Sequence, residues 1–147
     1  MIGLRVIPPP DDPLASFLER LPRALRRALE RSLEHALATA RRRMAPGGGG
    51  PRIRSGRLAR SLRARVHRRG DRLVGELSSD LPYAGVQEYG AVIQARSARY
   101  LKFRVQGRWV QVRRVVIPAR PYLRPALEEG RRVLEDYLRR ALEEEMP

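Results

Sequence analysis

The chain contains no cysteine among its 147 residues. Disulfide bonds, thiolate metal sites and cysteine nucleophiles are therefore excluded. No apolar run approaches the roughly 20 residues that a membrane-spanning helix needs, so we expect no membrane partner. The length suits one domain with a core of its own, and we predict a single domain over residues 1–147.

Acidic residues are scarce in two long segments. The 31 basic residues outnumber the 16 acids and give a net charge of +15, and Lys102 is the one lysine among 30 arginines. Residues 41–72 contain 12 arginines and one acid, and residues 96–120 contain eight basic residues and no acid. Such a surface can attract nucleic acid or an acidic protein, although an arginine-rich surface that is simply solvated is an alternative. The candidate contacts are Arg52, Arg54, Arg57, Arg65, Arg68, Arg69, Arg113 and Arg114.

The form of any DNA contact is limited by what the basic segments lack. Few aromatic residues interleave with the arginines, which disfavours a stacking platform for single strands. No helix-turn-helix or zinc pattern is present. We therefore expect any contact with DNA to be made to phosphates, without sequence readout.

Patterns for catalysis or metal binding are also missing. His35 and His67 are far apart, with no carboxylate at metal-ligand spacing, and we expect both to be solvated. The glycine run Gly47–Gly50 is not followed by Gly-Lys-Ser or Gly-Lys-Thr, which disfavours a phosphate loop. The acids near the C-terminus alternate with arginines at helical spacing, as on a solvated helix face. We predict no enzyme activity, no metal and no cofactor.

A long helix is predicted over residues 11–43. Asp11-Asp12-Pro13 is a typical helix start, with acids before a proline at the first helical position. Leucines then recur every three or four residues and predict an inward stripe of Leu14, Leu18, Leu21, Leu25, Leu29, Leu33 and Leu37. Pro22 should either kink this helix or start its main part. Residues 44–54, which hold the glycine run, are expected to form a flexible loop.

The C-terminal segment 119–147 predicts a second long helix, from about Pro121 to Glu145. Its expected inward stripe is Leu123, Leu127, Leu134, Tyr137 or Leu138, and Ala141 or Leu142. Gly130 falls on this stripe, which indicates a close approach to another backbone.

Residues 55–118 are expected to form a short helix followed by antiparallel strands. Ser55 is a candidate N-cap for a helix through Leu62. Apolar and basic residues alternate from Leu62 to His67, and a strand returns over residues 73–78. Arg69-Gly70-Asp71 matches a cell-adhesion motif, but a hairpin turn is the better interpretation.

The rest of this region predicts a second hairpin. Residues 82–90 should form a turn and a short helical segment. A strand over 100–105 meets Gln106-Gly107 at a two-residue turn, and residues 109–117 pair back with a bulge near Arg113 and Arg114. The predicted fold is α+β: an antiparallel sheet of about four strands packed by a long N-terminal and a long C-terminal helix.

Three motifs follow one another in a characteristic order. The first is Ser55-Gly56-Arg57-Leu58-Ala59-Arg60-Ser61. The second is Tyr83-Ala84 leading to Glu88-Tyr89-Gly90, and the third is Ala119-Arg120-Pro121-Tyr122-Leu123-Arg124-Pro125-Ala126. Together they resemble a tailed-phage family whose members complete the tail and join it to the head, often labelled virion morphogenesis or minor structural proteins.

This resemblance implies a structural role in the virion, without catalysis. It implies a homo-oligomer, commonly a six-fold ring around the DNA path at the neck or the head-proximal end of the tail. The protein could also be a monomer in solution until it assembles. The implied partners are other neck and tail-tube proteins, and the protein would be made in the host cytoplasm. Two alternatives stay open: a tail-tube terminator, and a nonspecific DNA-binding protein that uses the arginine-rich surface.

The motifs also supply candidate interface residues. These are Tyr83, Glu88, Tyr89, Tyr100, Trp109, Arg120 and Tyr122. Large aromatic side chains dominate interface hot spots, although ordinary core packing is the alternative for each. The predicted hairpin 100–117 offers unpaired backbone groups that could interlock with a neighbouring subunit.

Overall fold

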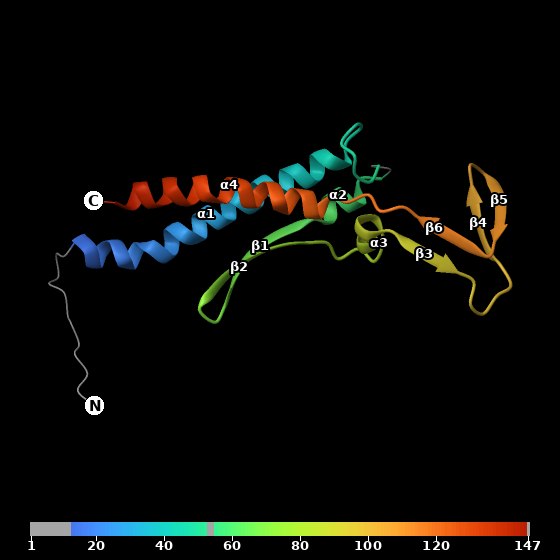
Figure 1. The fold of residues 1–147 in the computed structure, drawn as a ribbon, viewed down its shortest axis with the longest axis horizontal. Coiled ribbons are helices and arrows are strands. Elements are labelled where there is room, and N and C mark those ends of the chain that lie inside the picture. Colours follow the sequence, from blue (N-terminus) through green and yellow to red (C-terminus); the bar gives the residue numbers. More distant parts are fainter. Residues whose placement is uncertain (1–12, 53–54, 147) are drawn as a thin grey trace, which may run out of the picture.

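Two long antiparallel helices form the body of the molecule. The computed structural model describes residues 13–52 and 55–146. Helix α1 spans Pro13–Met44 and α4 spans Leu123–Glu145, and the two lie side by side (Figure 1). α1 continues through Pro22, so the alternative in which Pro22 starts the main helix is wrong. The predicted start at Asp11 and Asp12 lies outside the described residues.

Small residues line the contact between the helices. In α1 the buried side chains recur every four residues: Ala24, Ala28, Ser32, Ala36, Ala40 and Met44. In α4 they are Ala126, Gly130 and Ala141. Of the predicted leucine stripe, Leu21, Leu25, Leu29 and Leu37 are half-buried. Leu33 is buried, whereas Leu127, expected to point inward, is 40% exposed. Small side chains let the two backbones approach, and larger side chains such as Leu37, Leu123 and Leu138 pack around them.

Gly130 confirms the predicted close approach. A Cβ atom there would lie 2.9 Å from the Ala36 Cβ and 3.1 Å from the Ser32 carbonyl oxygen. The Ser32 hydroxyl donates a hydrogen bond of 2.8 Å to the Gly130 carbonyl oxygen. The buried polar side chain is thereby satisfied at the point where the helices are closest.

The first hairpin covers part of α1. Helix α2 spans Arg57–Ser61, and strands β1 (Arg63–Arg69) and β2 (Arg72–Ser78) pair antiparallel. Gly70 and Asp71 form the predicted turn, with Gly70 at φ +63°. Gly75 of β2 lies against Leu29 and Leu33, so a Cβ there would stand 3.0 Å from the nearest leucine methyl.

The remaining strands form an arm, defined here as residues 91–117. Helix α3 spans Ala84–Tyr89 and leads into β3 (Ala91–Gln94); β4 (Leu101–Val105), β5 (Arg108–Val112) and β6 (Arg114–Ile117) follow. β3 pairs with β6 and β4 pairs with β5. Figure 1 shows the β3–β6 ribbon extending from the body and carrying the β4–β5 hairpin at its tip.

The α+β class and the two long helices are confirmed, but the strands do not form one sheet. Within the described residues they form three antiparallel two-stranded sheets. The predicted strand 109–117 is divided at Arg113, so its first half pairs with β4 and its second half with β3, a strand the sequence did not predict. The predicted turn at Gln106-Gly107 is confirmed, with both residues at positive φ.

The glycine run lies against the end of α1. The Gly50 N–H donates to the Arg43 carbonyl oxygen at 2.8 Å. A Cβ at Gly48 would stand 2.4 Å from the Arg42 carbonyl oxygen. These glycines are needed because backbone groups close the last turn of the helix without room for a side chain.

Candidate interface: the Glu88 junction and the arm

Glu88 of α3 caps the N-terminus of α4. Its side chain is 4% exposed. Its Oε2 accepts hydrogen bonds from the backbone N–H groups of Tyr122 (2.7 Å) and Leu123 (2.8 Å), and its Oε1 accepts one from Arg124 (2.9 Å). A carboxylate at this position also meets the positive end of the helix dipole. We call this set of contacts the Glu88 junction.

The sequence at the start of α4 explains why a distant acid is needed. The first four N–H positions of a helix have no partner inside the helix. Here they fall on Tyr122, Leu123, Arg124 and Pro125, and proline has no N–H to satisfy. Tyr122 is the N-cap residue and makes no side-chain cap of its own. Glu88 therefore satisfies every free donor of the first turn.

Tyr122 is the second buried element of the junction. Its side chain is completely buried, and its hydroxyl donates to the Ala84 carbonyl oxygen at 3.3 Å. Burial, together with the nearby Glu88 carboxylate and Tyr83, raises the pKa of the Tyr122 hydroxyl to about 12. The phenol is therefore held in its neutral, donating form.

Gly90 joins the junction to the root of the arm. It has φ +74°, and a Cβ there would lie 2.7 Å from the Ile117 carbonyl oxygen and 2.8 Å from the Ala119 nitrogen. The Arg120 N–H donates to the Gln87 carbonyl oxygen at 2.8 Å. The chain thus enters the arm after α3 and leaves it before α4 at one closely packed place, which fixes the root of the arm to the helices.

The candidate interface residues divide into two groups. Glu88 and Tyr122 are buried within the chain, so neither side chain is accessible to a partner and both act in the junction instead. Tyr83 (40%), Tyr89 (71%), Tyr100 (39%) and Trp109 (60%) expose much of their surface. Arg120 is exposed as well. The second and third motifs, which suggested an interface with another protein, therefore contact each other within the chain.

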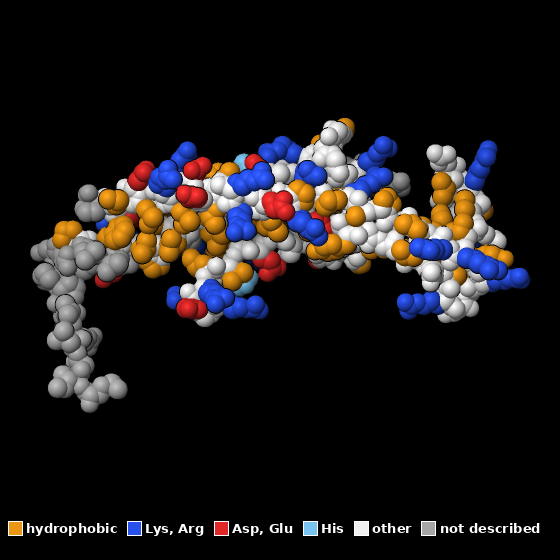
Figure 2. Space-filling model, viewed as in Figure 1, with side chains coloured by type: hydrophobic (Ala, Val, Ile, Leu, Met, Phe, Trp, Pro, Cys, Tyr) orange, Lys and Arg blue, Asp and Glu red, His pale blue; other side chains and the backbone are white. Residues whose placement is uncertain are grey.

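The exposed aromatic rings carry cations over their faces. The Lys102 Nζ lies 5.0 Å and the Arg104 Cζ 5.1 Å from the centre of the Trp109 ring. Arg99 and Arg113 each lie 5.7 Å from the Tyr100 ring, and Arg124 lies 5.8 Å from Tyr89. These contacts restrain long side chains on a surface where Figure 2 shows basic and apolar groups over the arm and no acidic ones.

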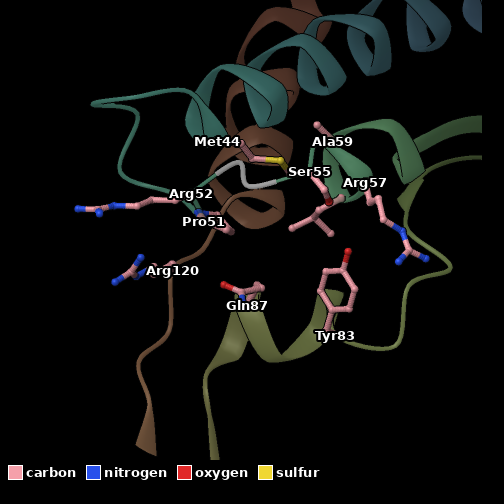
Figure 3. A pocket seen from close by; sticks show the side chains of 11 residues that line it. Met44, Pro51, Arg52, Ser55, Arg57, Ala59, Tyr83, Gln87 and Arg120 are labelled. Atoms are coloured by element: carbon pink, nitrogen blue, oxygen red, sulfur yellow. The ribbon is translucent and has the colours of Figure 1, made fainter. Parts of the chain in front are cut away.

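A cleft of about 590 Å³ adjoins the junction, between α2, α3 and the end of α1. Arg52, Arg57, Tyr83, Gln87 and Arg120 contribute to its lining. In Figure 3 the Arg52 and Arg120 side chains project on the same side, and the Tyr83 hydroxyl points towards the segment that carries Ser55. The cleft is lined by polar, basic and apolar side chains and opens to solvent.

The candidate arginines do not form one patch. Arg52 and Arg57 line the cleft, Arg65, Arg68 and Arg69 lie on β1, and Arg113 and Arg114 lie on the arm. Arg54 lies outside the described residues. Any partner that contacted all the described arginines would have to extend along most of the molecule.

The histidines differ in their surroundings. His67 lies exposed on β1, as expected, whereas His35 faces α4, with its Nε2 3.6 Å from Glu129 Oε1. The Nε2 atom is buried although the side chain as a whole is 30% exposed, so His35 is only partly solvated. Within residues 13–52 and 55–146, no group of three or more His, Asp or Glu side chains is placed to hold a metal ion. In the same ranges, no helix has the length and apolarity to span a membrane.

Comparison with known families decides the identity. Residues 12–90 match a family described as "Bacteriophage HK97-gp10, putative tail-component". The chain belongs to this family. No curated protein and no solved structure gave a match.

As a member of the HK97-gp10-like family, the protein is a structural component of a phage tail, and so of the virion, and not an enzyme. The matched range contains the first two motifs and ends at Gly90. The third motif lies beyond it. The structure connects the third motif to the second through Glu88.

Sequence reasoning missed the Glu88 junction although a signal was present. The last helix begins at Tyr122 with no Ser, Thr, Asp or Asn at its start and with proline in its first turn. A helix without a local cap needs an acceptor from elsewhere. The acid of the second motif was available for that role.

Proposed function

We propose that this tail component completes the tail and joins it to the head, at the head-proximal end of the tail. In this role it assembles as a homo-oligomeric ring around the DNA path, with six copies, and contacts other neck and tail-tube proteins. Residues 1–147 serve as one tail-completion-like domain. Membership of the family supports a place in the tail, and the resemblance of the three motifs supports the joining role.

One observation carries the proposal: the arm is fixed at its root and uncovered along its length. The Glu88 junction sets its direction relative to the helices, and two-stranded sheets leave strand edges unpaired. On the arm, Val92, Trp109 and Val116 each expose more than half of their surface. An element that is directed outwards and has unpaired strand edges is suited to docking on another protein of the virion, as the joining role requires.

Charge limits how such a ring can be built. With a net charge of +15 on each protomer, adjacent copies repel unless acidic neighbours neutralise them. A channel densely lined with arginine would also hold the passing DNA. We therefore expect many arginines to face acidic proteins or the outside of the ring. The protomer stays monomeric in dilute solution for the same reason.

Electron microscopy of phage with this gene disrupted tests the proposal. We expect DNA-filled heads beside unattached tails of normal length, and plasmid-borne protein should restore joined particles. Tails of abnormal length would instead indicate a tail-tube terminator. Normal joined particles would refute both roles.

Nonspecific DNA binding is the alternative that the arginines raise. It predicts an affinity for duplex DNA that falls steeply as salt increases, because counterions are released. The described candidate arginines lie in three separate places, which does not favour a single DNA-binding surface. Weak DNA binding together with a joining defect would favour the structural role.

A further inference from the structure

The β3–β6 ribbon has the sequence of buried strands in an exposed position. Residues 91–93 and 115–117 are all apolar, so both faces of the ribbon are apolar there. Continuous apolar runs are typical of strands that are covered on both faces. Yet Val92 is 54%, Ile93 43% and Val116 61% exposed.

The pairing register places two of these residues together. Val92 and Val116 are direct cross-strand partners, so their side chains project from the same face. Gln94 and Arg114, two residues further along, pair on that same face. The face is thus an apolar pair with a polar and basic border, which is the arrangement of a docking surface with an apolar centre.

The charge of the arm argues against a second copy of this chain as its partner. Residues 91–117 contain seven basic residues and no acid. The arm of a second copy would meet it with the same charge, and residues 41–72 of a second copy are more basic still. On α4, Glu145 already contacts Arg20 and Arg27, and Glu135 contacts Arg139. Other acids of α4, such as Glu128 and Asp136, are exposed but lie among arginines, and a second copy as a whole carries a net charge of +15. The basic arm therefore meets net repulsion from a second copy.

The apolar centre also argues against DNA as the occupant. DNA phosphates would bind the cations of the arm, but they would leave the side chains of Val92, Ile93 and Val116 exposed to water. Burying these side chains against an apolar protein surface is favourable, and a phosphate backbone offers no such surface. The free strand edges can in addition receive a strand from another protein.

We infer that the arm docks on a different virion protein, on a surface with an apolar centre and an acidic border. This inference rests on the proposed joining function and names the kind of partner that the arm recognises. Lys102 and Arg104, held over Trp109, and Arg113 and Arg114, at the end of the ribbon next to the β4–β5 hairpin, supply the charges that meet the acidic border.

Photo-crosslinking in assembled particles tests the partner. The full-length protein with Val116→p-benzoylphenylalanine is supplied to phage with the disrupted gene, and purified virions are irradiated. We expect a crosslink to another virion protein, within a peptide of net negative charge. The matched control places the same group at Glu135, whose side chain on α4 is 82% exposed, and should not give that product.

The other outcomes separate the two proposals. A crosslink to a second copy, to DNA or to a basic peptide, or no crosslink in joined particles, would overturn the inference and leave the joining function standing. Absence of the protein from joined particles would overturn the joining function itself.

Charge reversal provides an independent readout. Arg96→Glu with Arg99→Glu reverses two exposed charges on the arm; Arg65→Glu with Arg68→Glu reverses two exposed charges on β1. We expect about 100-fold fewer joined particles for the arm pair and little change for the β1 pair, because only the arm meets acidic groups closely. Thermal unfolding confirms that both variants fold. Equal losses would indicate general electrostatic attraction and contradict the inference.

Discussion

The carboxylate of Glu88 holds the backbone N–H of Tyr122 at 2.7 Å, across 34 residues of sequence. This contact starts α4 and at the same time fixes the place where the chain enters and leaves the arm. The helix and the arm therefore share one anchor, and their stability should be coupled through it.

Replacing Glu88 should destabilise the whole protein. Glu88→Gln loses a charged acceptor for three N–H groups, and we expect the free energy of unfolding to fall by about 2–3 kcal/mol. Urea denaturation followed by circular dichroism measures this. The control is Glu128→Gln, which changes an exposed acid of α4. Equal denaturation midpoints for the two variants would show that the cap contributes nothing.

Tyr122 should make stability depend on alkaline pH. The folded state raises the pKa of its hydroxyl from 10.0 to about 12, so folding favours the neutral form. The resulting contribution to the free energy of unfolding is fully present below pH 10. It is lost as pH rises through about 12, since the unfolded state releases the proton first. Tyr122→Phe should lose about 1 kcal/mol near neutral pH and lack this part of the alkaline decline. Tyr89→Phe, at an exposed ring, should keep the decline; identical pH profiles for the two variants would contradict the assignment.

Gly130 tests the contact between the helices. Alanine favours a helix by about 1 kcal/mol over glycine, but at this position its Cβ would meet Ala36 and Ser32. We expect Gly130→Ala to lower the free energy of unfolding by about 1–3 kcal/mol in denaturation experiments. Gly85→Ala in α3, where a Cβ meets nothing within 4 Å, should be neutral or stabilising. Stabilisation by both substitutions would mean that the helices are not closely packed.

Gly90 tests the root of the arm. Gly90→Ala adds a Cβ 2.7 Å from a backbone oxygen at positive φ, and we expect a loss of about 3 kcal/mol. Limited trypsin digestion should also cut the arm faster, at residues 96–114, because its root is loosened. Gly70→Ala has a similar φ of +63° but open space, and should cost only about 1–2 kcal/mol. Unchanged digestion of the arm in Gly90→Ala would show that the root does not restrain it.

Much of the local structure followed from residue spacing. The leucine repeat predicted α1, the alternation after Leu62 predicted β1, and Gln106-Gly107 predicted the turn of the β4–β5 hairpin. These features depend on neighbours within a few residues. The division of the remaining strands between separate sheets did not follow, because pairing β6 with β3 joins segments that no local pattern connects.

Sequence alone determined the class of the fold, the two long helices, the basic segments and the family, because each depends on composition or on the order of short motifs. Only the tertiary structure decided that small residues form the closest part of the helix contact, with leucines packed around them, since backbone distance selects side-chain size. It also decided that Glu88 and Tyr122 stabilise the protein's own junction. A carboxylate and a helix start 34 residues apart become partners only when the fold brings them together, and the same folding leaves the arm exposed.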